Sequence, residues 1–494
     1  ENYYEYIEEL GADRDGYVLT NFPYLNNGPK DLIGNSGKGK EYAYRSYFGR
    51  VMYSYADRYL FQANIRHDGS SRFAKKHRWG TFPSFSAGWV LSEENFMKNL
   101  NWDWLSFLKI RATWGALGNE RIGDFPYMST IAFGNTIFYQ NNGIYFDQTA
   151  SQQKYAIENV TWEKTESTDI GLDISFLNNR LRVNGDYYWK NTKDMLLAMA
   201  IPDFLGFSDP DVNAGKMSTK GYELNVSWND HIGDFSYGIA INFSDFTSKM
   251  GDLQGTQFLG DKVKMEGSEF NEWYGYVSDG LFLTEEDLKN SPKINDKNTQ
   301  LGDIKYKDIS GPDGVPDGKI SPEYDRVLLG SSLPHFLYGG NINLGYKNFD
   351  LSLAFQGVGK QNARLAREMV EPFRNNYGNF PAIIDGNYWS PYNTDEQNAV
   401  AKYPRLTHVN KSSNYAMSDY WLFNGGYFRL KNITLGYTFP KEWMNAIGIK
   451  GARIYASASD LFCLSKYPKG WDPEMGVSEY PITTSILLGV SVNF

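Results

Sequence analysis

The last eleven residues of the chain, TSILLGVSVNF, alternate apolar side chains with mostly polar or small ones. A period of two is typical of a β-strand with one apolar face. The strand runs to an aromatic residue at the chain end, whereas chain ends usually fray. A closed membrane barrel requires a last strand that seals against the first. The segment therefore predicts an outer-membrane β-barrel, with an assembly signal made of Ile486, Leu488, Val490, Val492 and Phe494.

The composition of the 494-residue chain fits a membrane barrel and argues against several other classes. It has no run of about 18 apolar residues, so no helix is expected to span a bilayer. Aromatic residues make up 16% of the chain and there are 48 glycines, which suits long twisted strands with aromatic belts. The single Cys463 excludes a disulfide framework. A net charge of −9 argues against a nucleic-acid partner.

Alternating segments recur along the whole chain. The segment FSYGIAINF, residues 235–243, places large apolar residues on one face and small or polar residues on the other. The alternation predicts an all-β, antiparallel transmembrane barrel. About thirteen strands are predicted, over residues 46–56, 58–67, 81–91, 107–117, 165–176, 179–190, 218–229, 234–246, 335–346, 348–357, 427–439, 451–461 and 484–494.

Strand length and connection length separate a membrane barrel from a soluble β-sandwich. Many predicted strands reach about ten residues, the length that crosses a bilayer at a tilt. Long connections, expected to be extracellular loops, alternate with tight turns at Ala56-Asp57, Asn178-Asn179 and Lys347-Asn348. Aromatic residues on the apolar face flank the short turns and predict a girdle at the inner membrane interface, made of Tyr55, Tyr59, Trp228, Phe235, Tyr346, Phe349 and Phe439.

The direction of the strands predicts how the chain is divided. If the last strand runs toward the periplasm, the strand at 46–56 does so too, and residues 1–45 are an extracellular loop region. Residues 46–494 are then the C-terminal part of the barrel. Because bacterial single-chain barrels have even strand numbers, an odd count predicts that N-terminal strands of the barrel are not in this chain. The chain begins without Met or a signal peptide, so we expect the targeting signal elsewhere.

Signatures of catalysis are sparse. The five histidines lack the HExxH spacing, and neither a G-x-S-x-G elbow nor a phosphate-binding loop occurs. The scattered Asp and Glu residues fit solvated loop carboxylates. We therefore expect no enzymatic activity and no required cofactor.

One acidic segment, KDISGPDGVPDGKISPEYDR at residues 307–326, is a candidate calcium loop. Calcium prefers several oxygen ligands from a tight turn, and Gly318 would release the backbone for such a turn. The segment departs from the EF-hand pattern because Gly311 and Pro312 interrupt it. An acidic, solvent-exposed turn is the alternative. The candidate ligands are Asp308, Ser310, Asp313, Asp317 and Asp325.

Three further patterns concern the wall and the loops. The run FRLKNITL changes face, which predicts a β-bulge near Lys431-Asn432. Charged residues on the polar face are expected to pair with one another or with a plug, or to contact substrate: Arg50, Arg66, Lys109, Arg111, Asp169, Asp173, Arg182 and Asp186. Loop aromatics are candidates for contact with sugars or peptides, or for stabilising a lid contact: Tyr388, Trp389, Tyr392, Tyr420 and Trp421.

Four segments resemble the SusC/RagA class of TonB-dependent outer-membrane transporters, in the order that the class has them. They are FPSFSAGWVLSEENF (82–96), LKIRATWGALGNERIGDFPY (108–127), YFRLKNITLGYTFP (427–440) and RIYASASDLFCLSKYPKGWDPEMG (453–476). The resemblance implies a barrel of about 22 strands, a size class with plugged lumens. It also implies a plug domain, which is expected to lie outside this chain, energy from a TonB-ExbB-ExbD complex and a SusD-like surface lipoprotein as partner.

The resulting hypothesis is the barrel portion of a nutrient importer in the outer membrane of a Gram-negative bacterium, which takes up oligosaccharides or peptides. Nothing in the residues chooses between a glycan and a peptide. The alternative is a secreted or surface-bound all-β module that binds glycans without transporting them. Detergent dependence separates the two, since a membrane barrel exposes its apolar face and a secreted module does not.

Overall fold

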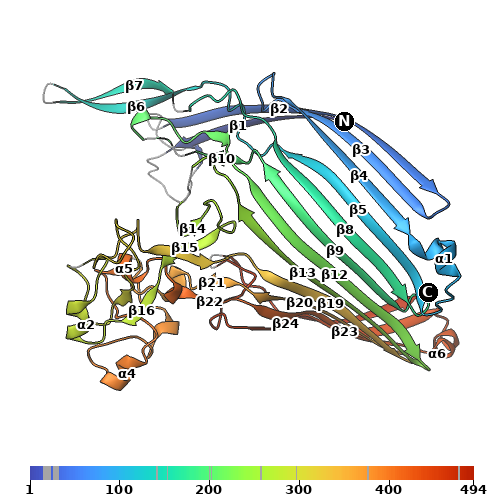
Figure 1. Ribbon diagram of the computed structural model, residues 1–494. Helices are drawn as coiled ribbons and strands as arrows, with labels where there is room; N and C mark the ends of the chain where they lie inside the picture. The colour runs from blue at the N-terminus through green and yellow to red at the C-terminus, as the bar shows by residue number, and fades with distance from the viewer. Residues whose placement is uncertain are drawn as a thin grey trace. The chain divides into compact units, whose positions relative to one another are not determined.

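The computed structural model describes residues 1–14, 24–25, 33–140, 143–152, 154–199, 201, 203–255, 259–295, 297–374, 378–476 and 479–494. Within these residues, one sheet of 14 strands holds most of the regular structure (Figure 1). Its order is β1-β2-β3-β4-β5-β8-β9-β12-β13-β19-β20-β23-β24-β25, and the neighbours whose register is given pair antiparallel. Because the order follows the sequence, each strand lies beside the next main strand along the chain.

The strands of the main sheet run from 9 residues in β25 to 23 residues in β2, so each can cross a bilayer at a tilt. Their bounds are β1 Asn2–Arg14, β2 Ile33–Tyr55, β3 Tyr59–Ser70, β4 Trp79–Val90, β5 Leu105–Asn119, β8 Glu163–Phe176, β9 Leu181–Lys193, β12 Met217–Ile232, β13 Phe235–Met250, β19 His335–Tyr346, β20 Phe349–Lys360, β23 Tyr427–Thr438, β24 Gly451–Ser465 and β25 Ser485–Asn493.

The long connections hold short strands and helices of their own. The strands are β6 Ile131–Gln140, β7 Gly143–Gln152, β10 Leu196–Ala198, β11 Asp211–Asn213, β14 Lys262–Val263, β15 Glu272–Tyr276, β16 Ser278–Leu281, β17 Ile304–Tyr306, β18 Arg326–Gly330, β21 Asn362–Arg364 and β22 Leu422–Asn424. The α-helices are α1 Asn95–Lys98, α2 Glu285–Asn290, α3 Arg367–Val370, α4 Asp395–Ala399, α5 Lys411–Asn414 and α6 Lys441–Ala446, and the 3₁₀ turns are η2 Leu91–Glu93, η3 Asp203–Leu205, η4 Ala382–Ile384 and η5 Asp419–Trp421. None of the helices among the described residues has the length and apolar character to cross a bilayer.

All thirteen predicted strands are present, and the sheet has one more, β1, in the region 1–45 that was predicted to be a loop. Its sequence NYYEYIEELGADR lacks a clean period of two, so alternation did not reveal it. It pairs with the first part of β2, from Asn2 opposite Arg45 to Arg14 opposite Ile33. Residues 2–14 and 33–45 therefore pair as a two-stranded β-ribbon, and the extracellular position of the region stays a prediction.

The three tight turns occur where the sequence predicts them. Ala56 and Asp57, Asn178 and Asn179, and Lys347 all have a positive φ between 52° and 64°. This left-handed conformation is costly for most residues and least so for Asn and Asp. Each turn reverses the chain between adjacent strands, as in the pair Tyr346 and Phe349 that faces across Lys347.

The apolar face of the strands is exposed rather than buried against a second sheet. In β24 and β25, Ile454 faces Val490 and Ala456 faces Leu488, whose side chain is 84% exposed. The other members of the stripe are exposed as well: Ile486, Val490, Val492 and Phe494. The neighbouring residues lie on the opposite face, where Ser457 pairs with Leu487. An exposed apolar stripe of this extent fits contact with lipid tails.

The chain forms two compact units. One comprises residues 1–88, 112–168 and 190–217, and its small core is Phe73, Phe82, Ile122, Val160 and Trp162. The other comprises residues 89–111, 169–189 and 218–494. Its larger core lies in the loops after β13 and after β20, whose short elements gather in one body in Figure 1.

Replacing Leu488 by Arg should impair barrel assembly, because an arginine in the middle of the lipid-facing stripe costs about 2–4 kcal/mol. The matched control is Leu487→Arg, one residue away on the polar face beside Ser457. The readout is the fraction of protein that resists SDS unless heated. We expect this fraction to fall for Leu488→Arg and to stay near wild type for Leu487→Arg. An equal loss in both variants would contradict the assignment of the two faces.

Candidate functional site

The polar face of the sheet carries charges that pair with one another. The Arg111 guanidinium on β5 donates to Asp186 at 2.8 Å and to Asp173 at 3.1 Å. Asn184 adds an amide hydrogen bond to Asp173 at 2.9 Å. These residues come from three consecutive strands of the sheet, so alternation places all of them on one face. The predicted mutual pairing is confirmed for this group, and it gives the wall a fixed polar lining.

The predicted β-bulge is present in β23. Ala354 of β20 faces Asn432 and Phe355 faces Leu430, so Lys431 is the extra residue. The register between β23 and β24 shifts at the same place. On β24, Asp460 takes a positive φ of 49°. A bulge re-aims side chains, and Arg429 and Lys431, on either side of Leu430, both lie near acidic groups of the β24–β25 region.

These two cations and the carboxylates near them are here called the Arg429 cluster, which consists of Arg429, Lys431, Asp460, Asp472 and Glu474. Arg429 is only 3% exposed, and its Nη2 donates to both oxygens of Asp472 at 2.6 Å. Its Nε lies 2.8 Å from Glu474 Oε1. Lys431 Nζ lies 2.7 Å from Asp460 Oδ1. The cluster therefore neutralises a buried guanidinium with carboxylates from two segments.

The Arg429 cluster anchors the β24–β25 connection to the wall. Asp472 and Glu474 belong to the motif GWDPEMG in that connection, whereas Arg429 lies on β23. Burial alone would raise the pKa of Asp472, but the hydrogen bonds from Arg429 and from the Glu474 backbone hold this pKa below its ordinary value. Its stabilising contribution is thus complete at neutral pH and lost as the pH falls through the lowered pKa. Sequence patterns did not reveal this contact, because the partners lie 43 residues apart.

At the ends of the strands with long connections, two loops fold into one body, here called the loop module, defined as the described residues of 251–334 and 361–426. Both segments contribute to one apolar core. Its buried members are Tyr276, Leu281, Ile304, Tyr306, Ile320, Met369, Val370, Ile384, Trp389, Tyr415 and Trp421. Burial raises the pKa of Tyr306, so its hydroxyl stays protonated and donates to the Ser413 carbonyl at 2.7 Å. The two loops are therefore packed against each other.

A buried carboxylate joins the two loops. Asp303, from the first loop, is fully buried and accepts hydrogen bonds from Arg405 at 2.7 Å, Asn410 at 2.8 Å and Asn414 at 2.9 Å, all from the second. A buried charge is tolerated only when it is paired and hydrogen-bonded. Asp303 therefore fixes the position of one loop against the other.

The backbones of the two loops also meet directly. The Tyr276 N–H donates to the Met417 carbonyl at 2.8 Å. A Cβ atom added at the neighbouring Gly275 would lie 2.2 Å from that carbonyl oxygen. Only glycine permits so close an approach.

The five aromatic residues predicted to contact substrate differ in how far the structure buries them. Trp421 is 2% exposed and Trp389 is also buried, both in the core of the loop module, so these two fit the alternative of stabilising the loops rather than contact with substrate. Tyr420 is half-buried, and its hydroxyl donates to the Lys402 carbonyl at 2.8 Å. Tyr388 is half-buried as well. Tyr392, at 96% exposed, has a free face, and its contact with substrate stays a prediction.

The candidate calcium loop uses its acidic residues in part to hold its own backbone. Asp325 is fully buried and accepts hydrogen bonds from the N–H groups of Ile309 at 2.8 Å and Ser321 at 2.7 Å. Asp308 Oδ2 accepts from the Gly318 N–H at 2.6 Å. Asp313 and Asp317 are exposed. No group of three or more His, Cys, Asp or Glu residues in the described part of the chain is arranged to hold a metal, and calcium binding stays a prediction.

Comparison with known proteins identifies the architecture. The sequence model of the family "TonB dependent receptor-like, beta-barrel" matches residues 3–461. The chain belongs to this family. The family confirms the predicted barrel and the predicted location in the outer membrane of a Gram-negative bacterium. Its members are transporters rather than enzymes.

Curated relatives confirm the resemblance to the SusC/RagA class. The chain is 32% identical over 468 residues to the TonB-dependent receptor SusC of Bacteroides thetaiotaomicron, covering 91% of the chain and 43% of SusC. It is 31% identical over 453 residues to the TonB-dependent receptor P3 of Formosa agariphila, covering 87% of the chain and 42% of P3. The chain thus spans less than half the length of these two relatives.

A solved structure shares the fold. The structure of the RagAB peptide transporter superposes with a TM-score of 0.78 at 23% identity, over 99% of this chain and 52% of that chain. Identity at this level supports the architecture of the sheet and its loops alone.

Replacing Arg429 by Met should release the β24–β25 connection, because removing one partner of a buried ion pair typically costs about 3–5 kcal/mol. Trypsin cleavage at Lys466 and Lys469, which lie in that connection, reports the release. The control is Arg180→Met, which removes an exposed 2.8 Å pair with Asp230 at a short turn. Wild-type cleavage rates in Arg429→Met would show that the cluster does not anchor the connection.

Removing calcium with EDTA should raise trypsin cleavage at Lys307 and Lys319 if the acidic loop holds the ion, since a cation would draw together the carboxylates that hydrogen bonds leave available. The comparison variant is Asp317→Asn, which removes the charge of an exposed candidate ligand. It should make cleavage high with or without EDTA. A wild-type protein whose cleavage does not respond to EDTA would remove the calcium prediction.

Proposed function

We propose that this chain forms the barrel portion of an energised outer-membrane importer for oligosaccharides or peptides. A SusD-like surface lipoprotein is its proposed partner, and the TonB-ExbB-ExbD complex supplies the energy through parts of the receptor outside this chain. Membership of the TonB-dependent receptor-like family supports the proposal at the level of the protein class. The nutrient, the lipoprotein and the energy source are proposed for this chain by analogy with its relatives.

The observation that carries the proposal is the opposite character of the two faces of one sheet. One face exposes a continuous apolar stripe, which Leu488 exemplifies. The other face holds hydrogen-bonded ion pairs such as Arg111 with Asp186. A wall with lipid on one side and a polar passage on the other is what a wide transport barrel requires. A secreted glycan-binding module would leave the exposed apolar stripe in contact with water. The outer-membrane location also argues against a secreted module.

The loop module supports a role in handling cargo at the cell surface. It is a folded body at the long-connection end of the wall, and it is held by an apolar core and by Asp303. Binding residues often lie on loops that a rigid scaffold positions. We place the first contact with cargo on this module, with Tyr392 as the exposed aromatic candidate. A rigid module also offers a surface on which a lipoprotein can dock.

The class of cargo is left as oligosaccharide or peptide because the descriptions of the relatives do not decide it. The RagAB complex is described as a peptide transporter, whereas the curated relatives are described as receptors without a named cargo. Flat aromatic faces suit both classes. A direct uptake experiment therefore has to decide between them.

Deleting the gene should abolish energy-dependent uptake of one cargo class in the parent bacterium. Fluorescent oligosaccharide and peptide pools are offered separately to wild-type, deleted and complemented cells, with and without a protonophore. We expect uptake of one pool to fall at least tenfold in the deleted strain. The protonophore should lower uptake of the same pool in wild-type cells by a similar factor. Unchanged uptake of both pools in the deleted strain would overturn the proposal, and uptake insensitive to the protonophore would remove the energised step.

A further inference from the structure

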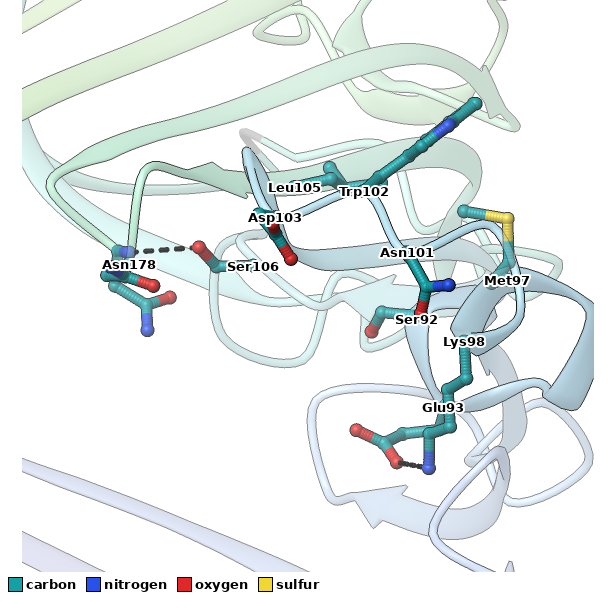
Figure 2. Close-up of a pocket in the computed structure, with 11 residues that line it drawn as sticks. Ser92, Glu93, Met97, Lys98, Asn101, Trp102, Asp103, Leu105, Ser106 and Asn178 are labelled. Atoms are coloured by element: carbon teal, nitrogen blue, oxygen red, sulfur yellow. Dashed lines mark hydrogen bonds and ion pairs between the residues drawn. The ribbon is translucent and has the colours of Figure 1, made fainter.

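A cavity of about 750 Å³ lies at the short-turn end of the wall, between the β4–β5 connection and the β8–β9 turn. Figure 2 shows Asn178 and Ser106 on one side of the open space, and Glu93 and Lys98 on the other. Asp103 lies between them. Short turns of outer-membrane barrels face the periplasm, so this cavity opens away from the loop module and has no part in the first contact with cargo.

The lining is polar and carries both charges. Lys98 Nζ, at the end of α1, forms an ion pair with Glu93 Oε2 at 2.7 Å. Asp103 contributes a second carboxylate, and Asn178 an amide. The Asn179 N–H donates to Ser106 Oγ at 3.2 Å, which fixes the β8–β9 turn against β5. A site with two carboxylates and one ammonium favours a ligand that carries a cation beside an anion.

Exposed aromatic rings connect the cavity with the lipid-facing stripe. Trp102 lines the cavity and stacks on Trp104 at 5.3 Å, and Trp104 stacks on Phe176 at 5.7 Å. Trp102 is 44% exposed and Trp104 is 49% exposed. Phe176 ends β8, whose apolar face includes the exposed Ile170. Tryptophan is enriched at membrane interfaces because its ring is apolar and its N–H is polar. The stacked rings of Trp102, Trp104 and Phe176 thus lead from the cavity to the lipid-facing surface.

We propose that this cavity binds the head group of a zwitterionic phospholipid, of the phosphoethanolamine class, from the inner leaflet of the outer membrane. The phosphate lies beside Lys98, the ammonium lies between Asp103 and Glu93, and the acyl chains follow Trp104 and Phe176. The volume is within the range of about 300–1,000 Å³ that small-molecule sites occupy. An anionic head group is disfavoured because the two carboxylates outnumber the single ammonium of Lys98 and repel a net negative charge.

A lipid bound in this cavity anchors the periplasmic end of the wall at a fixed depth in the membrane. Phe96 and Leu100, both exposed beside the cavity on the same connection, add apolar surface at the same end. This anchor goes beyond the proposed import, because lipid binding here depends on neither the cargo nor the energy source.

Native mass spectrometry of the purified protein in mild detergent tests the site. The protein is mixed with phosphatidylethanolamine or with phosphatidylglycerol of the same acyl chains. We expect one phosphatidylethanolamine to be retained by the wild type, and its retention to fall at least tenfold in the double variant Lys98→Gln, Asp103→Asn. The matched control is Lys466→Gln, Asp147→Asn, which changes an exposed lysine and an exposed aspartate in two long connections.

Folding is checked for every variant by resistance to SDS without heating, so that a loss of lipid is read only from folded barrels. Equal retention of phosphatidylglycerol by the wild type would overturn the zwitterionic assignment. Equal retention of phosphatidylethanolamine by the double variant and its control would overturn the site. A double variant that fails to fold is replaced by Ser106→Trp, which fills the cavity without changing its charge and should give the same loss.

Discussion

Pairing of backbone groups within the sheet is the constraint on which the rest of this structure depends. The hydrocarbon part of a membrane offers no partner for an N–H or a carbonyl, so each strand must be bonded to its neighbours. Sequential antiparallel pairing meets this need with the shortest connections. The turns at Ala56, Asn178 and Lys347 permit it by accepting left-handed backbone. Once the strands are paired, alternation alone sends one set of side chains outward and the other inward.

The outward and inward sets then divide the work of the wall. Outward residues such as Leu488 need only be apolar, and their exact packing has little consequence. Inward residues are held by specific contacts, as Arg111 is by Asp173 and Asp186. At the outer end of β23 these contacts become longer in range, because Arg429 reaches carboxylates of a different connection. The lining therefore stiffens the wall and also fixes what projects from it.

Sequence periodicity could predict the wall but not the body built on its loops. Thirteen strands, three turns and the bulge at Lys431 follow from local patterns, because each depends on neighbouring residues. The strand β1 has no such pattern. The contacts of Asp303 and Arg429 join segments 102 and 43 residues apart, and no spacing rule relates them. For the same reason the sequence left two roles open for Trp421, and only its buried position in the loop core favours a stabilising role.

The buried Asp303 limits how the surface of this protein can move. Its carboxylate holds Arg405, Asn410 and Asn414 of the other loop, and withdrawing any of these would leave a charge or an amide stranded away from water. Separating the two loops therefore costs the free energy of leaving a buried polar group without its hydrogen bond. A displacement of either loop relative to the wall therefore carries the other loop with it.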